Sequence, residues 1–252
     1  PVRQRILHLP ATLQSTAALG AARLIDYQDI AYAQAYLDAL DAVIGLDKAR
    51  GGELRVAREV ARGLALWMSF EDVMRVADLK TRLDRQQAIR AEVDAKDPEL
   101  VYVSEFVKPR VEEICGSLPA PIGERLLRSA RARGWLARFT GGRRIHTGHI
   151  GGFLLLRGLA AWRHLRRRTQ RYVIESARIE SWLGNTKRLM HTDYELALEL
   201  AASQRLVKGY GETHERGWAK FSSLTEAALA AEGQAGAAER IRRLREEALL
   251  TE

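Results

Sequence analysis

The stretch Ile30-Ala-Tyr-Ala-Gln-Ala-Tyr-Leu-Asp-Ala-Leu-Asp-Ala-Val-Ile44 decides the fold class of this chain. Apolar residues recur in it at alternating steps of three and four, which is the signature of one helix face. A second stretch, Leu54–Met68, repeats the pattern after a natural break at Arg50-Gly51-Gly52. The two stripes comprise Ile30, Ala33, Leu37, Leu40, Ile44, Leu54, Ala57, Ala61, Leu64 and Met68. We therefore expect a chain built from amphipathic helices.

The same reasoning predicts helices along the rest of the chain. Ser69-Phe-Glu-Asp72 resembles an N-cap with an acidic residue three positions on, and it opens a helix that Asp97-Pro98 ends. The long pattern that starts at Phe153 predicts one helix to about Met190. The capping box Thr192-Asp-Tyr-Glu195 opens the next helix. Further helices are expected at 111–115, 122–133, 217–231 and 237–250.

Only two segments are typical of strands. Leu100–Val107 is rich in β-branched and aromatic residues, and Arg143–Ile150 is the second candidate. Strands and helices do not alternate, which excludes a doubly wound nucleotide-binding fold. The sequence predicts a mainly α protein, an antiparallel helical bundle in one or two lobes with at most a small β-ribbon. The lobes are expected at residues 1–98 and 99–252.

The positive charge is concentrated in one region. The whole chain carries a formal charge of +8, yet Glu124–Arg171 holds thirteen arginines, no lysine and one acidic residue, a local balance of +12. Such asymmetry indicates an anionic partner, whether phosphate, a nucleotide, nucleic acid or an acidic protein surface. Trp135, Trp162 and Tyr172 are interleaved with these arginines. The spacing nevertheless favours a basic helix face that is solvated or pairs with an acidic subunit over a nucleic-acid interface.

Cysteine usage and hydropathy limit the compartment. Cys115 is the only cysteine, so an intrachain disulfide and a four-thiolate iron–sulfur site are both excluded. The longest apolar run, Ile150–Leu156, is stopped by Arg157, far short of the ~20 residues that a membrane span needs. We expect a cytoplasmic chain without membrane contact. Because the chain opens with Pro1 and not Met, we also expect it to be part of a longer polypeptide.

The most distinctive candidate site is Lys208-Gly-Tyr-Gly-Glu-Thr-His-Glu-Arg-Gly217. It is expected to form a helix end, a two-glycine loop and a helix start, with Gly209 as the residue after the helix and Thr213 as the next cap. A phosphate or carboxylate could bind there. The candidate cofactor-binding residues are Lys208, Gly209, Tyr210, Gly211, Thr213, His214 and Arg216. An ordinary turn with solvated charges is the alternative, and the residues alone favour it.

Three smaller groups of residues are also candidates for a functional role. Tyr32 and Tyr36 share a helix face and either line a polar pocket or, as we favour, close a core edge with satisfied hydroxyls. His146 and His149 lack the third ligand that a zinc site needs. Cys115 follows two acids, which disfavour a thiolate, so a small buried residue is expected. Phosphate-loop, dinucleotide, zinc-protease and thiamine motifs are absent from the sequence, which makes this segment alone a poor enzyme candidate.

Several stretches resemble the C-terminal region of indolepyruvate ferredoxin oxidoreductase beta-type subunits, over roughly residues 20–221. They are Arg23–Tyr32 with Tyr36–Asp38, Glu59–Met68, Glu71–Arg82, Glu105–Cys115 and Leu206–His214. The resemblance implies an accessory part in the oxidative decarboxylation of aryl-pyruvates to acyl-CoA. It further implies that thiamine diphosphate, iron–sulfur clusters, CoA and ferredoxin serve the whole enzyme, with no cofactor held by this segment alone. Glu212 stands where the family commonly has Asp, and no catalytic residue carries over.

Three functions therefore remain open at the level of sequence. The first is an accessory domain of a 2-oxoacid oxidoreductase that assists assembly or contacts an anionic cofactor. The second is a basic helical module that binds nucleic acid. The third is a purely structural oligomerisation domain.

Overall fold

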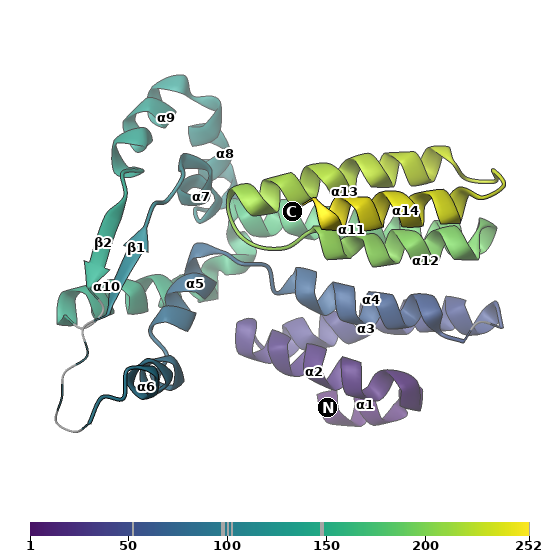
Figure 1. The fold of residues 1–252 in the computed structure, drawn as a ribbon, viewed down its shortest axis with the longest axis horizontal. Coiled ribbons are helices and arrows are strands. Elements are labelled where there is room, and N and C mark those ends of the chain that lie inside the picture. Colours follow the sequence, from purple (N-terminus) through teal and green to yellow (C-terminus); the bar gives the residue numbers. More distant parts are fainter. Residues whose placement is uncertain (52, 97–98, 100, 102, 147–148, 252) are drawn as a thin grey trace. The chain divides into compact units, whose positions relative to one another are not determined.

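The computed structural model is mainly helical, with one small antiparallel ribbon, as the sequence predicts (Figure 1). It describes residues 1–51, 53–96, 99, 101, 103–146 and 149–251. The chain forms two compact units. Unit 1 comprises residues 1–70 and 175–252, and unit 2 comprises residues 71–174. The boundary expected at residues 98 and 99 falls inside unit 2.

Unit 1 is a helical bundle in which α4 packs against α2, α3 and α12, while α14 packs against α12 and α13. Helices α13 and α14 run antiparallel and are joined by a short loop, as Figure 1 shows. Its elements are α1 (Val2–His8), α2 (Ala11–Tyr27), α3 (Ile30–Ala49), α4 (Arg55–Met68), α11 (Gln170–Thr192, from Glu175 onward), α12 (Tyr194–Ala202), η3 (Ser203–Leu206), α13 (Glu212–Ala230) and α14 (Ala237–Leu250).

The two decisive stripes form the core of unit 1, with two exceptions: Ile30, and Leu54, which is half-buried as the N-cap residue of α4 with a φ of +56°. Ile30 is 56% exposed because it is the first residue of α3, directly after the N-cap Asp29, which accepts a hydrogen bond from the Tyr32 backbone N–H at 2.8 Å. Tyr32 and Tyr36 are buried, and their hydroxyls donate to backbone carbonyls of α4 at 2.9 Å each. The favoured interpretation, tyrosines that close a core edge, is confirmed.

Unit 2 contains shorter helices around the ribbon. β1 and β2 pair antiparallel with Ser104 opposite His146, so the predicted ribbon forms, but over four residues a side. Leu100 and Tyr102 of the expected strand lie outside the described residues. The elements of unit 2 are α5 (Val73–Lys80), α6 (Leu83–Glu92), β1 (Ser104–Val107), α7 (Val111–Gly116), α8 (Ala120–Arg128), α9 (Ala130–Leu136), η1 (Ala137–Phe139), β2 (Arg143–His146), α10 (Ile150–Ala161), η2 (Trp162–Arg168) and the first turn of α11.

The helix predicted from Ser69 to the Asp97-Pro98 end is wrong in two places. Asp72, and not Ser69, caps α5, because its carboxylate accepts from the Arg75 backbone N–H at 2.7 Å. The helix then breaks at Thr81, whose hydroxyl donates back to the Ala77 carbonyl at 2.9 Å, and α6 starts two residues later. The predicted end lies outside the described residues.

Two further predicted helices are also interrupted. Ser129 separates α8 from α9 and caps α9 through the Ala132 N–H, so the expected helix 122–133 is in fact two. The expected helix 153–190 is divided into α10, η2 and α11, with extended backbone at Thr169. The cap of α12 is Asp193, not Thr192, which still belongs to α11.

A buried ion pair fixes the middle of unit 2. Arg166 is 1% exposed, and its Nε and Nη2 donate to the two Asp72 carboxylate oxygens at 2.6 and 3.2 Å. Because Asp72 also caps α5, this pair ties η2 to the start of that helix. In α7, Cys115 is fully buried, and burial, followed by the charge of Glu112, raises the pKa of its thiol. The prediction of a small buried cysteine is confirmed.

Over the described ranges, none of the helices combines the length and the hydropathy that crossing a lipid bilayer requires.

Candidate functional site

A buried carboxylate collects three polar partners in unit 1. Glu175, on α11, is fully buried. One of its oxygens accepts from the Trp67 indole Nε1 at 2.8 Å, and the other lies 2.9 Å from Arg178 Nη1 and 3.1 Å from His214 Nε2. Side chains from α4, α11 and α13 thus meet at one point. Buried charge is tolerated where it is paired and hydrogen-bonded, as it is here. We call Trp67, Glu175, Arg178 and His214 the Glu175 cluster.

Aromatic rings surround this cluster. The guanidinium of Arg178 stacks 3.9 Å above the ring of Trp218, which is a favourable cation–π geometry. Trp67 in turn packs on Trp182, Trp218 and Phe221, with ring centroids 5.2 to 6.2 Å apart. The carboxylate is therefore held in an apolar shell, while Arg178 keeps 23% of its side chain exposed. Arg178 is the member of the cluster that reaches solvent.

The predicted loop lies directly before the helix that supplies His214. Gly209 and Gly211 have φ of +76° and +61°, so both need glycine, as the sequence indicates. However, α12 ends at Ala202 and a 3₁₀ turn follows, so Gly209 does not end the α-helix. Thr213 is not the cap of α13, because Gly211 occupies that position without a side-chain hydrogen bond.

The structure separates the predicted anion-binding residues into two groups. Lys208, Thr213 and Arg216 are exposed, and Tyr210 is half-buried. His214 is 4% exposed and directed to Glu175, so it belongs to the cluster and not to the loop surface. Two carboxylates, Glu212 and Glu215, lie in the first turn of α13 beside these cations. An anion at the loop would therefore depend on the exposed cations more than on the helix N-terminus.

The apolar pattern that predicts this helix does not single out Glu175 or Arg178. The residues that are buried in α11 are Glu175, Ile179, Trp182, Leu183, Thr186, Leu189 and Met190. A lone carboxylate four residues before Ile179 and seven before Trp182, on that same face, was the available signal. Buried polar groups are usually hydrogen-bonded, so a carboxylate on a buried helix face predicts hydrogen-bond partners on the neighbouring elements.

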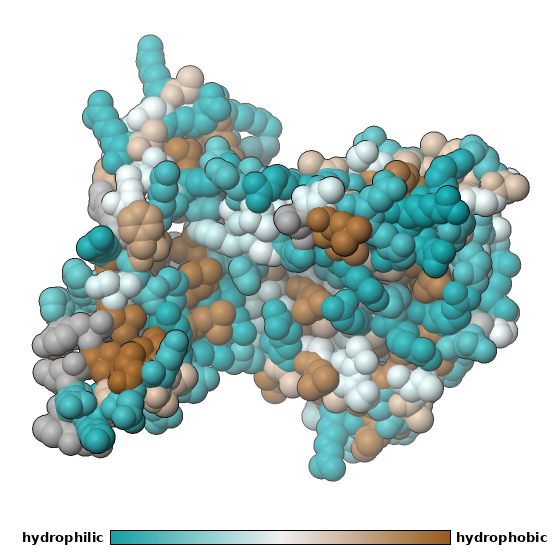
Figure 2. Space-filling model, viewed as in Figure 1, coloured by the Kyte–Doolittle hydropathy of each residue, from teal (hydrophilic) through white to brown (hydrophobic). Residues whose placement is uncertain are grey.

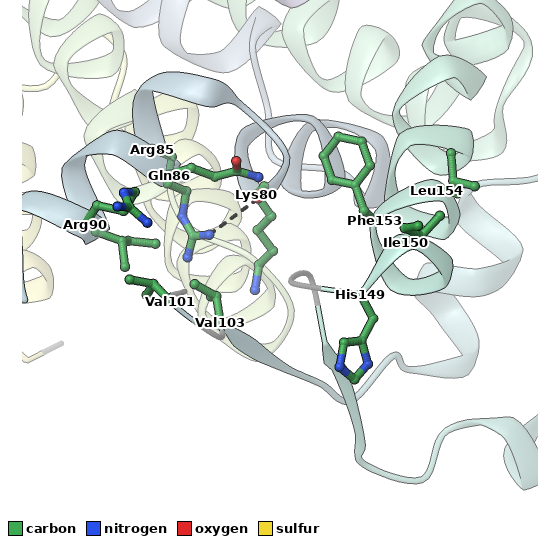
Figure 3. A pocket seen from close by; sticks show the side chains of 11 residues that line it. Lys80, Arg85, Gln86, Arg90, Val101, Val103, His149, Ile150, Phe153 and Leu154 are labelled. Atoms are coloured by element: carbon green, nitrogen blue, oxygen red, sulfur yellow. Dashed lines mark hydrogen bonds between the residues drawn. The ribbon is translucent and has the colours of Figure 1, made fainter. Parts of the chain in front are cut away.

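A second feature is a cavity of about 390 Å³ in unit 2, shown in Figure 3. Lys80, Arg85 and Arg90 approach it from α5 and α6, and Phe153 and Ile150 face it from α10. Glu105 pairs with both Lys80 and Arg85 at its edge, with 2.7 Å between Arg85 Nη2 and the carboxylate. Burial alone raises the pKa of Glu105, but the hydrogen bond and charge of Lys80, reinforced by Arg85, outweigh it, and the pKa is lowered.

The other sequence candidates occupy the surface of unit 2. Trp135 and Phe139 stack edge-to-face at 4.9 Å and are 57% and 43% exposed, beside the exposed Arg131 and Arg138. Within the basic stretch, Arg128 pairs with Glu124 and Arg166 pairs with Asp72. The rings of His146 and His149 lie 5.5 Å apart. Within the described part of the chain, His, Cys, Asp and Glu side chains do not gather in threes as a metal ion would require.

A protein-family model matches most of the chain. The sequence model of a family of unknown function, DUF6537, matches residues 13–227. The chain belongs to this family. The DUF6537 match includes the Glu175 cluster, the glycine loop and all of unit 2, and it nearly coincides with the region 20–221 that carries the resemblance noted above. No curated protein and no solved structure matches the chain significantly.

Proposed function

We propose that this DUF6537 chain is an accessory helical domain of a 2-oxoacid oxidoreductase of the indolepyruvate ferredoxin type. In this role it assists assembly of the enzyme and contacts an anionic cofactor. It does not perform the decarboxylation itself, which relies on thiamine diphosphate, iron–sulfur clusters and CoA bound elsewhere in the enzyme. Ferredoxin and the other domains or subunits are the partners of the whole enzyme.

The observation that carries the proposal is that the separate stretches of the resemblance meet in space within each unit. In unit 1, the hydroxyl of Tyr32, from Arg23–Tyr32, donates to the backbone carbonyl of Met68, from Glu59–Met68, at 2.9 Å. Trp67, from Glu59–Met68, and His214, from Leu206–His214, both contact Glu175. In unit 2, Lys80, from Glu71–Arg82, pairs with Glu105, the first residue of the next stretch. Stretches far apart in sequence therefore build shared contacts, which supports a resemblance of whole units and not of isolated motifs.

The contact with an anionic cofactor is assigned to the glycine loop. Lys208 and Arg216 are exposed on either side of two glycines with positive φ, and these glycines allow close approach to the backbone. Arg178 reaches solvent from the Glu175 cluster, where Trp218 and Glu175 hold its guanidinium. Phosphate and carboxylate groups are recognised by such exposed, oriented cations.

The test starts from the complex as it exists in cells. The tagged chain is purified anaerobically from its source with its partners. We expect subunits that bind thiamine diphosphate and iron–sulfur clusters, together with CoA-dependent reduction of ferredoxin by indolepyruvate. A complex without these subunits and without this activity would exclude the proposal.

The loop is tested in the same complex with Lys208→Ala/Arg216→Ala. We expect the KM for CoA or for thiamine diphosphate to rise at least about tenfold, because each charge-assisted hydrogen bond contributes about 1.5–3 kcal/mol. The matched control is Arg3→Ala, at an exposed arginine of α1. If both variants assemble and respond to the two cofactors like the wild type, the cofactor contact is excluded and assembly alone remains.

Nucleic-acid binding is the second candidate, and the exposed arginines around Trp135 and Phe139 favour it. Bases stack on exposed aromatic rings, and arginines neutralise phosphates. A fluorescent single-stranded RNA should then bind with log affinity falling linearly with log salt, and Trp135→Ala should weaken it. Absence of binding at low salt would exclude this function.

A further inference from the structure

The cavity of unit 2 combines cations with apolar walls. Its volume of about 390 Å³ lies in the range of small-molecule sites, roughly 300–1,000 Å³. Lys80, Arg85 and Arg90 line one side, and Figure 3 shows the ring of Phe153 on the other. The described lining residues include no Asp or Glu. Such a surface matches a ligand that is negative at one end and apolar at the other.

The cations are held by neighbouring groups rather than left to move freely. Lys80 and Arg85 share the buried carboxylate of Glu105, so two positive charges face one negative charge there. Arg90 also lines the cavity and donates to the backbone carbonyls of Glu99 and Lys96, at 2.8 and 3.4 Å. Lys80, Arg85 and Glu105 together keep an excess of positive charge next to the cavity.

The start of α10 adds a second, independent attraction for an anion. His149, Ile150, Phe153 and Leu154 line the cavity and belong to the N-cap and first turn of this twelve-residue helix. The N-cap residue His149 makes no side-chain capping hydrogen bond, and the first turn of the helix contains no acidic residue. The N-terminus of a helix carries unpaired N–H groups and a partial positive charge.

The apolar wall is unusually open to solvent. Ile150 and Leu154 are 79% and 60% exposed, although they stand next to a cavity that could cover them. Figure 2 shows hydrophobic surface over this part of the molecule, where α6 and the start of α10 lie in Figure 1. Exposed apolar groups of this size next to a cavity are typical of ligand sites.

We propose that this cavity binds a free organic anion that has a carboxylate or phosphate head and a hydrocarbon body. The head lies between Lys80, Arg85 and the N-terminus of α10. The body lies against Phe153, Ile150 and Leu154. The site is independent of the glycine loop and of the proposed accessory function.

Octanoate is the probe, added to the full chain and followed by isothermal titration calorimetry. Two matched molecules each carry one half of its chemistry: octanol has the hydrocarbon body, and inorganic phosphate has a charged head. We expect octanoate to bind at least about tenfold more tightly than either, because both subsites contribute. Equal affinity of octanol and octanoate would exclude the anion subsite. Failure of octanoate to bind, or equal binding of phosphate, would overturn the proposal.

A charged side chain introduced into the cavity distinguishes specific binding there from non-specific hydrophobic binding elsewhere on the surface. Ile150→Glu puts a carboxylate in the first turn of α10, where it favours the helix and repels a bound anion. We expect it to keep the fold and to weaken octanoate at least about tenfold, since like charges a few ångströms apart repel strongly. Ile150→Gln, which loses apolar contact but adds no charge, should weaken octanoate less than Ile150→Glu does, and Leu155→Glu, on the same helix but outside the lining, should bind octanoate like the wild type. Equal loss in Leu155→Glu, or no loss in Ile150→Glu, would contradict the assignment.

The same head-and-tail chemistry occurs in lipids. Vesicles of phosphatidylglycerol distinguish an enclosed site for a free molecule from a lipid surface. We expect no co-sedimentation with them at physiological salt. Co-sedimentation that Ile150→Glu abolishes would assign the apolar wall to a membrane surface and overturn the free ligand.

Discussion

Replacing Glu175 by Ala tests the central claim about unit 1. The carboxylate is fully buried and has three polar partners within 3.1 Å. Removing one partner of a buried ion pair costs about 3–5 kcal/mol. Arg178 retains 23% exposure, so water can hydrate the guanidinium that loses its partner, and the low end applies. The Trp67 indole N–H has no such access. We therefore expect the free energy of unfolding to fall by about 3 kcal/mol.

The assay is urea denaturation followed by tryptophan fluorescence, because Trp67, Trp182 and Trp218 lie in or beside the cluster. The matched control is Glu180→Ala, an exposed acid on the same helix, which should change stability by no more than about 0.5 kcal/mol. Glu175→Gln should lie in between, because the amide oxygen still accepts from Trp67. A loss in Glu175→Ala no larger than in the control would refute the description of the cluster as a buried, mutually dependent group.

Three further predictions concern single contacts. Gly217→Ala would place a Cβ 2.1 Å from the backbone carbonyl oxygen of Leu206 and should unfold unit 1 or lower its Tm sharply. Gly184→Ala, with open space around it, should stabilise the chain by up to about 1 kcal/mol. Similar Tm shifts for the two variants would contradict the packing around Gly217. Arg166→Met leaves the Asp72 carboxylate buried without its partner, and the free energy of unfolding measured by urea denaturation should fall by about 3–5 kcal/mol. An unchanged free energy of unfolding would contradict the buried ion pair. The pKa of Glu105 is lowered from 4.5, so the carboxylate stabilises the fold at neutral pH and this contribution is lost as the pH falls below 4.5. In Glu105→Gln, Tm should therefore decrease less steeply below pH 4.5 than in the wild type.

Hydrophobic periodicity predicted where helices lie better than where they stop. Thr81, Ser129 and Thr169 interrupt three of the expected helices, and each bonds through its hydroxyl to nearby backbone. Such local bonds give the backbone an alternative to the helix. They leave the spacing of the apolar residues in the sequence unchanged. A prediction based only on the spacing of apolar residues therefore does not detect the helix breaks at these positions.

The candidate site was predicted in part. The need for glycine at 209 and 211 followed from local chain geometry, and the structure has positive φ at both. The inward direction of His214 depends on Glu175, which lies 39 residues earlier, and no local pattern near His214 indicates it. A long-range contact of this kind can be predicted only when Glu175 is recognised as part of the buried face of α11.

The single cysteine makes unit 2 observable on its own. Cys115 is shielded from solvent, and its raised pKa keeps the thiol protonated at neutral pH. A disulfide reagent can therefore react with it only during excursions that open residues 71–174, and the reaction rate extrapolated over reagent concentration reports the frequency of those excursions. Every ligand, salt or subunit that tightens this half of the protein will slow the reaction, without any label having been introduced.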